Sequence, residues 1–218
     1  GIGLPNAASD FVGLQGEVVF DNTRSSGMNL LDGTRVKLRA QQQQSMRTSS
    51  ESFFKITLDA RNYTKIYRDL TLATRISVGH SGGPAPKQSV LGGIDNWIPF
   101  GTVREVRNAE NPLNPMNIDF RDVFFTDFVT PLRGFRMNKL SGESYAVFNA
   151  ELRWPIFKVL SRGPITSTFL QNFQLTAFTD IGTAWTGSGP FSRQNSLNTE
   201  IISPPGSPWY ASVNNFKN

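Results

Sequence analysis

The sequence predicts an all-β protein, and within that class an antiparallel β-barrel that spans a membrane. Three observations in the 218 residues support this prediction. Several segments alternate between apolar and polar residues, these segments run for about ten residues or more, and aromatic residues flank them. Strands of globular proteins usually have about five or six residues, whereas a strand that crosses a bilayer needs about nine to eleven.

The first part of the chain contains four alternating segments, separated by turn-forming stretches. We expect strands at about residues 11–21, 33–44, 52–63 and 66–79. In the second of these, Val36 and Leu38 alternate with Arg35, Lys37 and Arg39. Because successive side chains of a strand point to opposite faces, each strand has one apolar face and one polar face.

Two further alternating segments follow a long stretch without strong periodicity. We expect strands at about residues 144–155 and 170–186, and loops at about 80–143 and 187–218. Asn149, Glu151 and Arg153 share the polar face of the first strand, and Asp180 lies on the polar face of the second. The chain thus carries about six strands. A loop of about sixty residues is unusual in a compact soluble domain, but membrane barrels have long loops at one end.

A soluble β-sandwich is the main alternative to the barrel. Its inner face is apolar and its outer face is polar, so its strands show the same alternation. Strand length and flanking aromatic residues favour the barrel, but the alternation itself fits both folds. The sequence therefore leaves open a soluble sandwich that acts as a binding module.

Composition argues against several kinds of site. The chain has no cysteine, which excludes disulfides, thiolate metal sites and a cysteine nucleophile. A single histidine, His80, is too few for a histidine-rich zinc site, and Asp95, Asp127 and Glu143 show no paired spacing. The net charge is +5, but Lys and Arg are scattered rather than gathered in a block. We expect no enzyme activity, no cofactor, no metal and no nucleic-acid partner.

Four motifs occur together and in order along the chain. They are EVVFDNTR followed by LDGTRVKL, LRGF at 132–135, NAELRWPI at 149–156 and FTDIGTAW at 178–185. This ordered set resembles the C-terminal barrel of the outer-membrane assembly and bacterial surface antigen superfamily, which includes the BamA- and TamA-type proteins. The resemblance implies a barrel of about sixteen strands in the cell outer membrane. It also implies that the RGF motif lies on a long extracellular loop folded back into the lumen.

The resemblance assigns a locking role to the RGF motif. Arg133 corresponds to the family's loop arginine, and Glu151 and Asp180 correspond to the acidic residues of the barrel wall on which it docks. The alternation agrees with this, because both acidic residues lie on the polar register of their strands. Gly134 would allow a tight turn, and Phe135 would anchor the tip of the loop. An arginine–carboxylate pair shielded from water is geometrically specific.

The chain departs from the family pattern in two places. The LGGIDNW segment at 91–97 precedes the RGF motif by about forty residues, which indicates an insertion over 94–131. The family's last strands have no counterpart, so we expect the remaining barrel strands to come from sequence beyond this chain. LGGIDNW and LNTEII at 197–202 are also similar to barrels that follow a TolB-like propeller in Bacteroidetes-type bacteria.

The resemblance implies a barrel that inserts or translocates polypeptides at the outer membrane. The implied partners are the lipid bilayer, client polypeptides and other envelope proteins. The alternative is a structural anchor or an accessory barrel subunit of a larger outer-membrane complex. The motifs indicate the fold more directly than the activity, since one fold hosts several functions.

Overall fold

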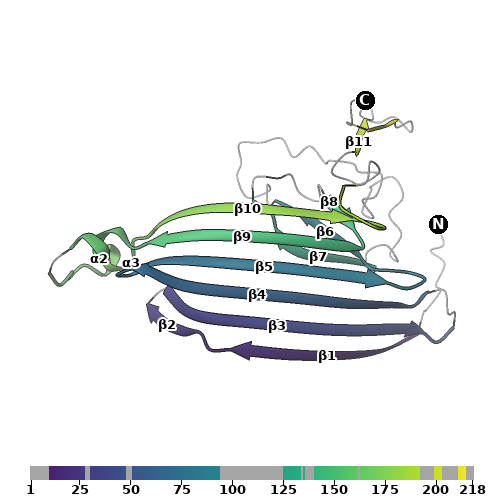
Figure 1. Cartoon of the computed structure of the whole chain (residues 1–218), viewed down its shortest axis with the longest axis horizontal. Helices are drawn as coiled ribbons and strands as arrows, with labels where there is room; N and C mark the ends of the chain where they lie inside the picture. Colours follow the sequence, from purple (N-terminus) through teal and green to yellow (C-terminus); the bar gives the residue numbers. More distant parts are fainter. Residues whose placement is uncertain are drawn as a thin grey trace, which may run out of the picture.

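The computed structural model of the chain describes residues 10–27, 30–47, 51–93, 125–133, 135, 140–161, 163–191, 199–202 and 211–214. Its main element is an antiparallel sheet with the strand order β1-β3-β4-β5-β9-β10 (Figure 1). These strands are β1 (Phe11–Asp21), β3 (Leu30–Ser45), β4 (Phe53–Tyr67), β5 (Leu70–Gly82), β9 (Ser144–Trp154) and β10 (Leu175–Trp185). The short β2 (Arg24–Gly27) pairs with the beginning of β3.

The strand register separates the side chains onto two faces. Val18, Leu38, Leu58, Val78 and Ala146 stand directly opposite one another across five neighbouring strands. This side of the sheet is largely exposed and apolar, and we call it the outer face. Its exposed large side chains include Val12, Leu14, Val18, Phe20, Leu38, Phe54, Ile56, Ile76, Phe148, Trp154, Leu175 and Ile181.

The opposite side, which we call the inner face, carries charged side chains that pair across strands. Arg39 donates from Nε to Glu17 over 2.8 Å. Asp59 accepts hydrogen bonds from the Nε atoms of Arg61 and Arg75, each over 2.7 Å. A strand with lipid on one side and a polar interior on the other has this composition.

A second sheet occupies part of the region expected as one loop. It contains β6 (Gln88–Gly92), β7 (Thr126–Pro131) and β8 (Leu140–Gly142), in the order β7-β6-β8. The expectation of a loop over 80–143 is therefore wrong for these segments. β6 and β7 pair in parallel, although more than thirty residues of chain separate them. Such pairing between distant short segments leaves no local period in the sequence.

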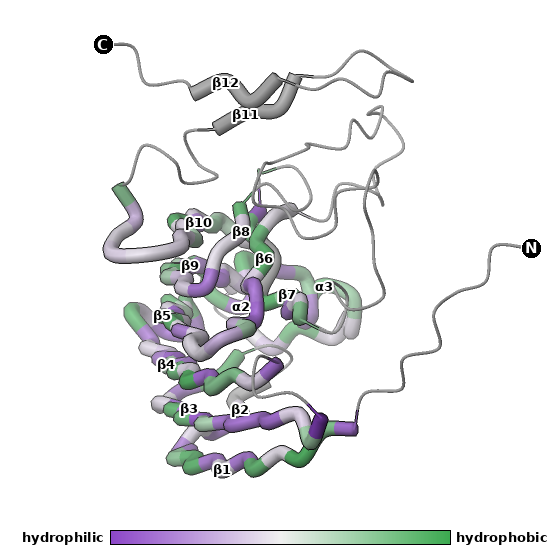
Figure 2. Tube along the Cα trace, turned by 90° about the vertical axis from the view of Figure 1, so that its right-hand side faces the viewer, coloured by the Kyte–Doolittle hydropathy of each residue, from purple (hydrophilic) through white to green (hydrophobic). Residues whose placement is uncertain are grey.

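The second sheet lies against the inner face of the main sheet, on the side of β9 and β10 (Figure 2). The buried apolar core forms between the two sheets. It consists of Leu91, Leu132, Leu140, Tyr145, Val147 and Ala184. Tyr145 stands opposite Gly79 in the register, and a Cβ at Gly79 would overlap its ring. The absence of a side chain at Gly79 therefore leaves space for the Tyr145 ring on the inner face.

The position of the core argues against the soluble sandwich. In a sandwich, the second sheet covers the apolar face of the first. Among the described residues, the second sheet instead covers the charged inner face, and the apolar outer face stays exposed. A large continuous exposed apolar surface marks contact with lipid or a partner.

Several strand ends differ from those expected. β4 continues to Tyr67 and β5 begins at Leu70, so the turn lies at Arg68–Asp69 rather than near residue 64. Pairing holds these extensions together, with Lys65 opposite Thr71. At its other end, β5 runs on to Gly82. The paired strands therefore extend beyond the residues over which the sequence shows apolar alternation.

Two short helices lie between the last two expected strands, and the second of them overlaps the beginning of the strand expected at 170–186. The connection from β9 to β10 contains α2 (Ile156–Leu160) and α3 (Thr168–Asn172), so the strand expected from residue 170 begins at Leu175. The tail expected as a loop contains the paired strands β11 (Thr199–Ile202) and β12 (Ala211–Asn214). No helix among the described residues is long and apolar enough to cross a bilayer.

Candidate functional site

The most densely hydrogen-bonded cluster on the inner face surrounds Arg133, which follows β7. The residue before it, Leu132, is fully buried in the core, and its N–H donates to the carbonyl of Gly92 over 2.8 Å. This bond ties the segment to the end of β6. Burial of the Leu132 side chain and this backbone bond fix the position of the segment. The side chain of Arg133, the next residue, extends toward β9 and β10.

Arg133 binds Asp180 of β10 with both side chain and backbone. Its Nε donates to Oδ2 over 2.7 Å, its Nη2 to Oδ1 over 2.9 Å, and its backbone N–H to Oδ2 over 3.0 Å. The Asp180 side chain is only 1% exposed. Two parallel side-chain bonds match the planar guanidinium to the planar carboxylate, which fixes orientation as well as distance.

The remaining edge of the guanidinium reaches β9. Arg133 Nη1 donates to Glu151 Oε2 over 3.1 Å, and Glu151 Oε1 accepts from Arg153 Nε over 2.7 Å. The Phe178 ring centroid lies 3.8 Å from Arg133 Cζ, so the guanidinium stacks on an aromatic face. One loop side chain thus bridges two neighbouring strands of the wall.

The electrostatics of the cluster stabilise the charge of the arginine. The hydrogen bond with Asp180 raises the pKa of the Arg133 guanidinium above its ordinary value, against the opposite effect of burial. Asn149 Nδ2 donates to Asp180 Oδ1 over 2.8 Å, which further satisfies the covered carboxylate. A buried carboxylate requires such partners, because an unpaired charge away from water is costly.

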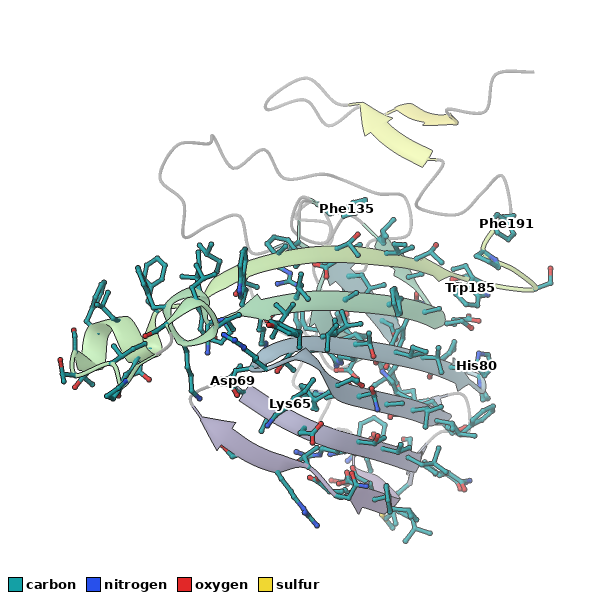
Figure 3. The ribbon with its side chains drawn as sticks, turned by 60° about the vertical axis from the view of Figure 1, so that its left-hand side comes forward. Lys65, Asp69, His80, Phe135, Trp185 and Phe191 are labelled. Carbon is teal, nitrogen blue, oxygen red and sulfur yellow. The ribbon has the colours of Figure 1, made fainter. Side chains whose placement is uncertain are left out.

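The structure brings together three of the five residues in the expected lock. Arg133, Glu151 and Asp180 are in direct contact. Phe135 is partly buried and packs against the apolar core rather than against the two acids, and its position is marked in Figure 3. Gly134 lies outside the described residues. Whether the cluster acts as a lock stays a prediction.

Sequence reasoning did not assign Phe178, Asn149 or Arg153 to this cluster. Phe178 lies two residues before Asp180, so both side chains point to the inner face. The signal for it was an aromatic residue between Thr176 and Asp180 on the polar face. Asn149 and Arg153 likewise flank Glu151 on one face, which the alternation alone shows.

A second contact ties the second sheet, β6–β8, to β4 of the main sheet. Lys55 of β4 places Nζ 2.6 Å from Asp127 Oδ2 in β7 and 3.4 Å from Ser89 Oγ in β6. Lys55 is 5% exposed and Asp127 is 46% exposed. The contact borders a cavity of about 400 Å³. Its lining includes the basic residues Arg35, Lys37, Arg39, Arg61 and Arg75 and the acidic residues Asp59 and Asp127.

The chemistry of these clusters is that of binding and positioning. His80 Nδ1 lies 2.8 Å from Ser144 Oγ, and its ring contacts Phe54 near one end of the strands β4 and β5. The described residues contain no group of three or more His, Asp or Glu side chains that could hold a metal ion. What the arrangement around Arg133 can do is hold a segment of the chain against β9 and β10.

The comparison with protein families decides the identity. The model of the Omp85 superfamily domain matches residues 8–213. The chain belongs to the Omp85 superfamily. No curated protein matches it. As an Omp85 protein it is an outer-membrane protein, its outer face is lipid-facing, and its inner face lines the lumen of a β-barrel.

Family membership also places the β6–β8 sheet. Since β6, β7 and β8 lie against the inner face, these three strands lie on the luminal side of the Omp85 barrel wall. Proteins of this family serve polypeptide insertion or translocation in general terms. The narrower Bacteroidetes-type assignment stays a prediction, and most of the expected insertion, residues 94–124, lies outside the described residues.

Proposed function

We propose that this barrel inserts or translocates polypeptides at the outer membrane, and that the Arg133 segment braces its wall during that work. The supporting observation is that Arg133 bonds to Asp180 and Glu151 at once, and so joins β9 and β10 through the luminal segment. A barrel that pairs client strands at an open edge must keep the register of its other strands. A luminal brace on adjacent strands serves that need.

The proposal names its partners by chemistry. Unfolded client strands supply backbone N–H and C=O groups for β-augmentation, and the bilayer receives their apolar faces. Other envelope proteins deliver the clients. No step requires a cofactor, a metal or a bond-breaking side chain, so we propose that the barrel is not an enzyme.

A reconstituted folding assay tests this function. Full-length protein is placed in phospholipid vesicles, and a urea-denatured eight-stranded outer-membrane barrel from the same envelope is added as client. Client folding is followed by its faster migration on unboiled gels. We expect folding several-fold faster than in empty vesicles, and a reduced rate with Arg133→Ala. The control variant Arg24→Ala, at an exposed arginine of β2, should match the wild type.

A structural anchor is the second candidate, and one observation favours it. The β6–β8 sheet fills part of the lumen and packs through an apolar core against β9 and β10, which suits a static, plugged barrel. If correctly folded protein leaves the client rate at that of empty vesicles, insertion is contradicted and the anchor is favoured. A co-purified soluble partner would then be the expected result of mild detergent extraction.

A further inference from the structure

The connection between β9 and β10 exposes a cluster of aromatic rings. The ring centroids of Phe157 and Phe173 lie 5.4 Å apart, and those of Phe169 and Phe173 lie 6.0 Å apart. All three side chains are exposed, Phe169 at 72%, and Leu160 beside them is exposed as well. Aromatic rings gathered together without cover mark a contact surface.

The register of β10 shows which way the cluster faces. Leu175 begins the strand on the outer face, opposite the outward-facing Trp154 of β9. Phe173 precedes Leu175 by two residues and has an extended backbone, with φ −72° and ψ 121°. Side chains two residues apart in extended chain share a face, so Phe173 continues the outer face. Phe157 contacts the Phe173 ring in an edge-to-face arrangement, and Phe169 contacts it at a tilt.

The opposite side of α2 is tied to the turn between β4 and β5. Val159 is buried, Lys158 Nζ lies 3.0 Å from Asp69 Oδ2, and Arg68 Nη1 donates to the carbonyl of Val159. Figure 3 shows Asp69 at the end of the sheet that carries the helices, with His80 at the other end. These bonds hold α2 against the β4–β5 turn, and Phe157 of the same helix is exposed.

We infer that the β9–β10 connection is an interfacial membrane anchor, with Phe157, Phe169 and Phe173 seated among lipid headgroups and the upper acyl chains. The occupant is the bilayer, because the cluster is continuous with the lipid-facing outer face through Trp154 and Leu175. Each helix has five residues and is far too short to cross a bilayer, but amphipathic segments lie in its surface with their apolar side inward. Aromatic rings are favoured at that depth.

Lipid-depth quenching tests the anchor. Phe169→Trp is introduced into the full-length protein, which is folded into phosphatidylcholine vesicles, and the emission of the wild type is subtracted. The vesicles carry bromine either near the headgroup or near the end of the acyl chain. We expect the added tryptophan to lose more than about half its emission to the shallow bromine and much less to the deep one.

Two matched variants fix the meaning of the result. Ile56→Trp on the outer face should be quenched by brominated lipid, and Thr57→Trp, which borders the luminal cavity, should be quenched only by aqueous iodide. Faster gel migration before boiling verifies that each variant is folded. If Phe169→Trp behaves like Thr57→Trp, the anchor is disproved. Protection from both lipid and iodide would show a protein partner or a second copy on the cluster, which also overturns it. The outcome is independent of client insertion.

Discussion

Among the described residues, the segment between β5 and β9, called here the luminal segment, meets the barrel wall at two ionic contacts of opposite polarity. At the first, the wall supplies Asp180 and the loop supplies Arg133; at the second, the wall supplies Lys55 and the loop supplies Asp127. In both, the wall charge is buried and the loop charge is about one-third to one-half exposed. The wall thus holds a buried charge that depends on the loop for its partner.

The two contacts differ in geometric demand. Arg133 makes three hydrogen bonds to Asp180 and one to Glu151, and stacks on Phe178. Lys55 has a single short contact with Asp127, since its other partner, Ser89, lies 3.4 Å away. A guanidinium fork requires both distance and direction, whereas an ammonium acts as a point charge. We infer that the first contact sets the position of the loop and the second mainly neutralises the wall.

The largest effect is expected from Arg133→Glu. The substitution sets a third carboxylate against Asp180 and Glu151 and removes the charge that compensates them. Breaking a buried pair costs about 3 to 5 kcal/mol, and the partial exposure of Arg133 favours the lower value. The measurement is the urea midpoint of the full-length protein folded in vesicles, followed by loss of heat-modifiable gel mobility.

A charge swap sharpens this prediction. Adding Glu151→Arg to Arg133→Glu recreates one ion pair at the same site, so it should recover part of the lost stability. It should not recover all of it, because Asp180 keeps a carboxylate as its new neighbour. Wild-type stability of Arg133→Glu alone would remove the docking interpretation, and no recovery in the double variant would show that Glu151 is not a partner.

The second contact should show an asymmetry between its two partners. Asp127→Asn leaves the buried Lys55 ammonium without a counter-charge, which should cost about 2 kcal/mol. Lys55→Met removes the buried charge and leaves an Asp127 side chain that water reaches, so it should cost about 1 kcal/mol or less. Urea midpoints of the two variants, measured side by side, check the order.

The double variant Lys55→Met with Asp127→Asn serves as the control for that order. It removes both charges, so its stability should lie close to that of Lys55→Met alone. If Asp127→Asn proves the milder of the two single changes, burial of the wall lysine does not determine the energetics. The claim that a buried wall charge determines the energetics of both contacts would then fail. The interpretation of the Arg133 site would not change.

The sequence predicted the Arg133 site and missed the Lys55 contact for a physical reason. Glu151 and Asp180 lie in long alternating strands, so the alternation by itself assigns them to the polar face of the wall. Arg133 was found through the family motif around it. Asp127 lies in a six-residue strand that pairs in parallel with a distant segment. Nothing local in the sequence records such a pairing.

The same reasoning explains the luminal sheet and the helices. Ser89 of β6 and Ser141 of β8 are fully buried. Because both residues are polar, the sequence indicated a loop at these positions. Their burial depends on tertiary packing against the wall, which overrides local preference. In the β9–β10 connection, α2 and α3 have five residues each, too few for a helical repeat to be seen.

The smallest effect is expected at an ion pair on the inner face that binds no described part of the luminal segment. Glu17 of β1 pairs with Lys37 at 3.0 Å and with Arg39 at 2.7 Å, but all three side chains are open to water. Exposed pairs contribute little because water solvates the separated charges nearly as well. Glu17→Gln should therefore leave the urea midpoint unchanged within its scatter.

An unchanged midpoint would be informative because Glu17, like Asp180 and Lys55, is a paired charge on the inner face. Unlike those two side chains, it is not buried. If stability followed the number of ionic contacts, Glu17→Gln would cost at least as much as Asp127→Asn, since among the described residues Glu17 has two basic partners and Asp127 has one. If it follows burial of the wall charge, the two variants separate clearly. A large loss for Glu17→Gln, confirmed by its disappearance in high salt, would mean that the cationic wall is stabilised by its overall charge balance rather than by the loop.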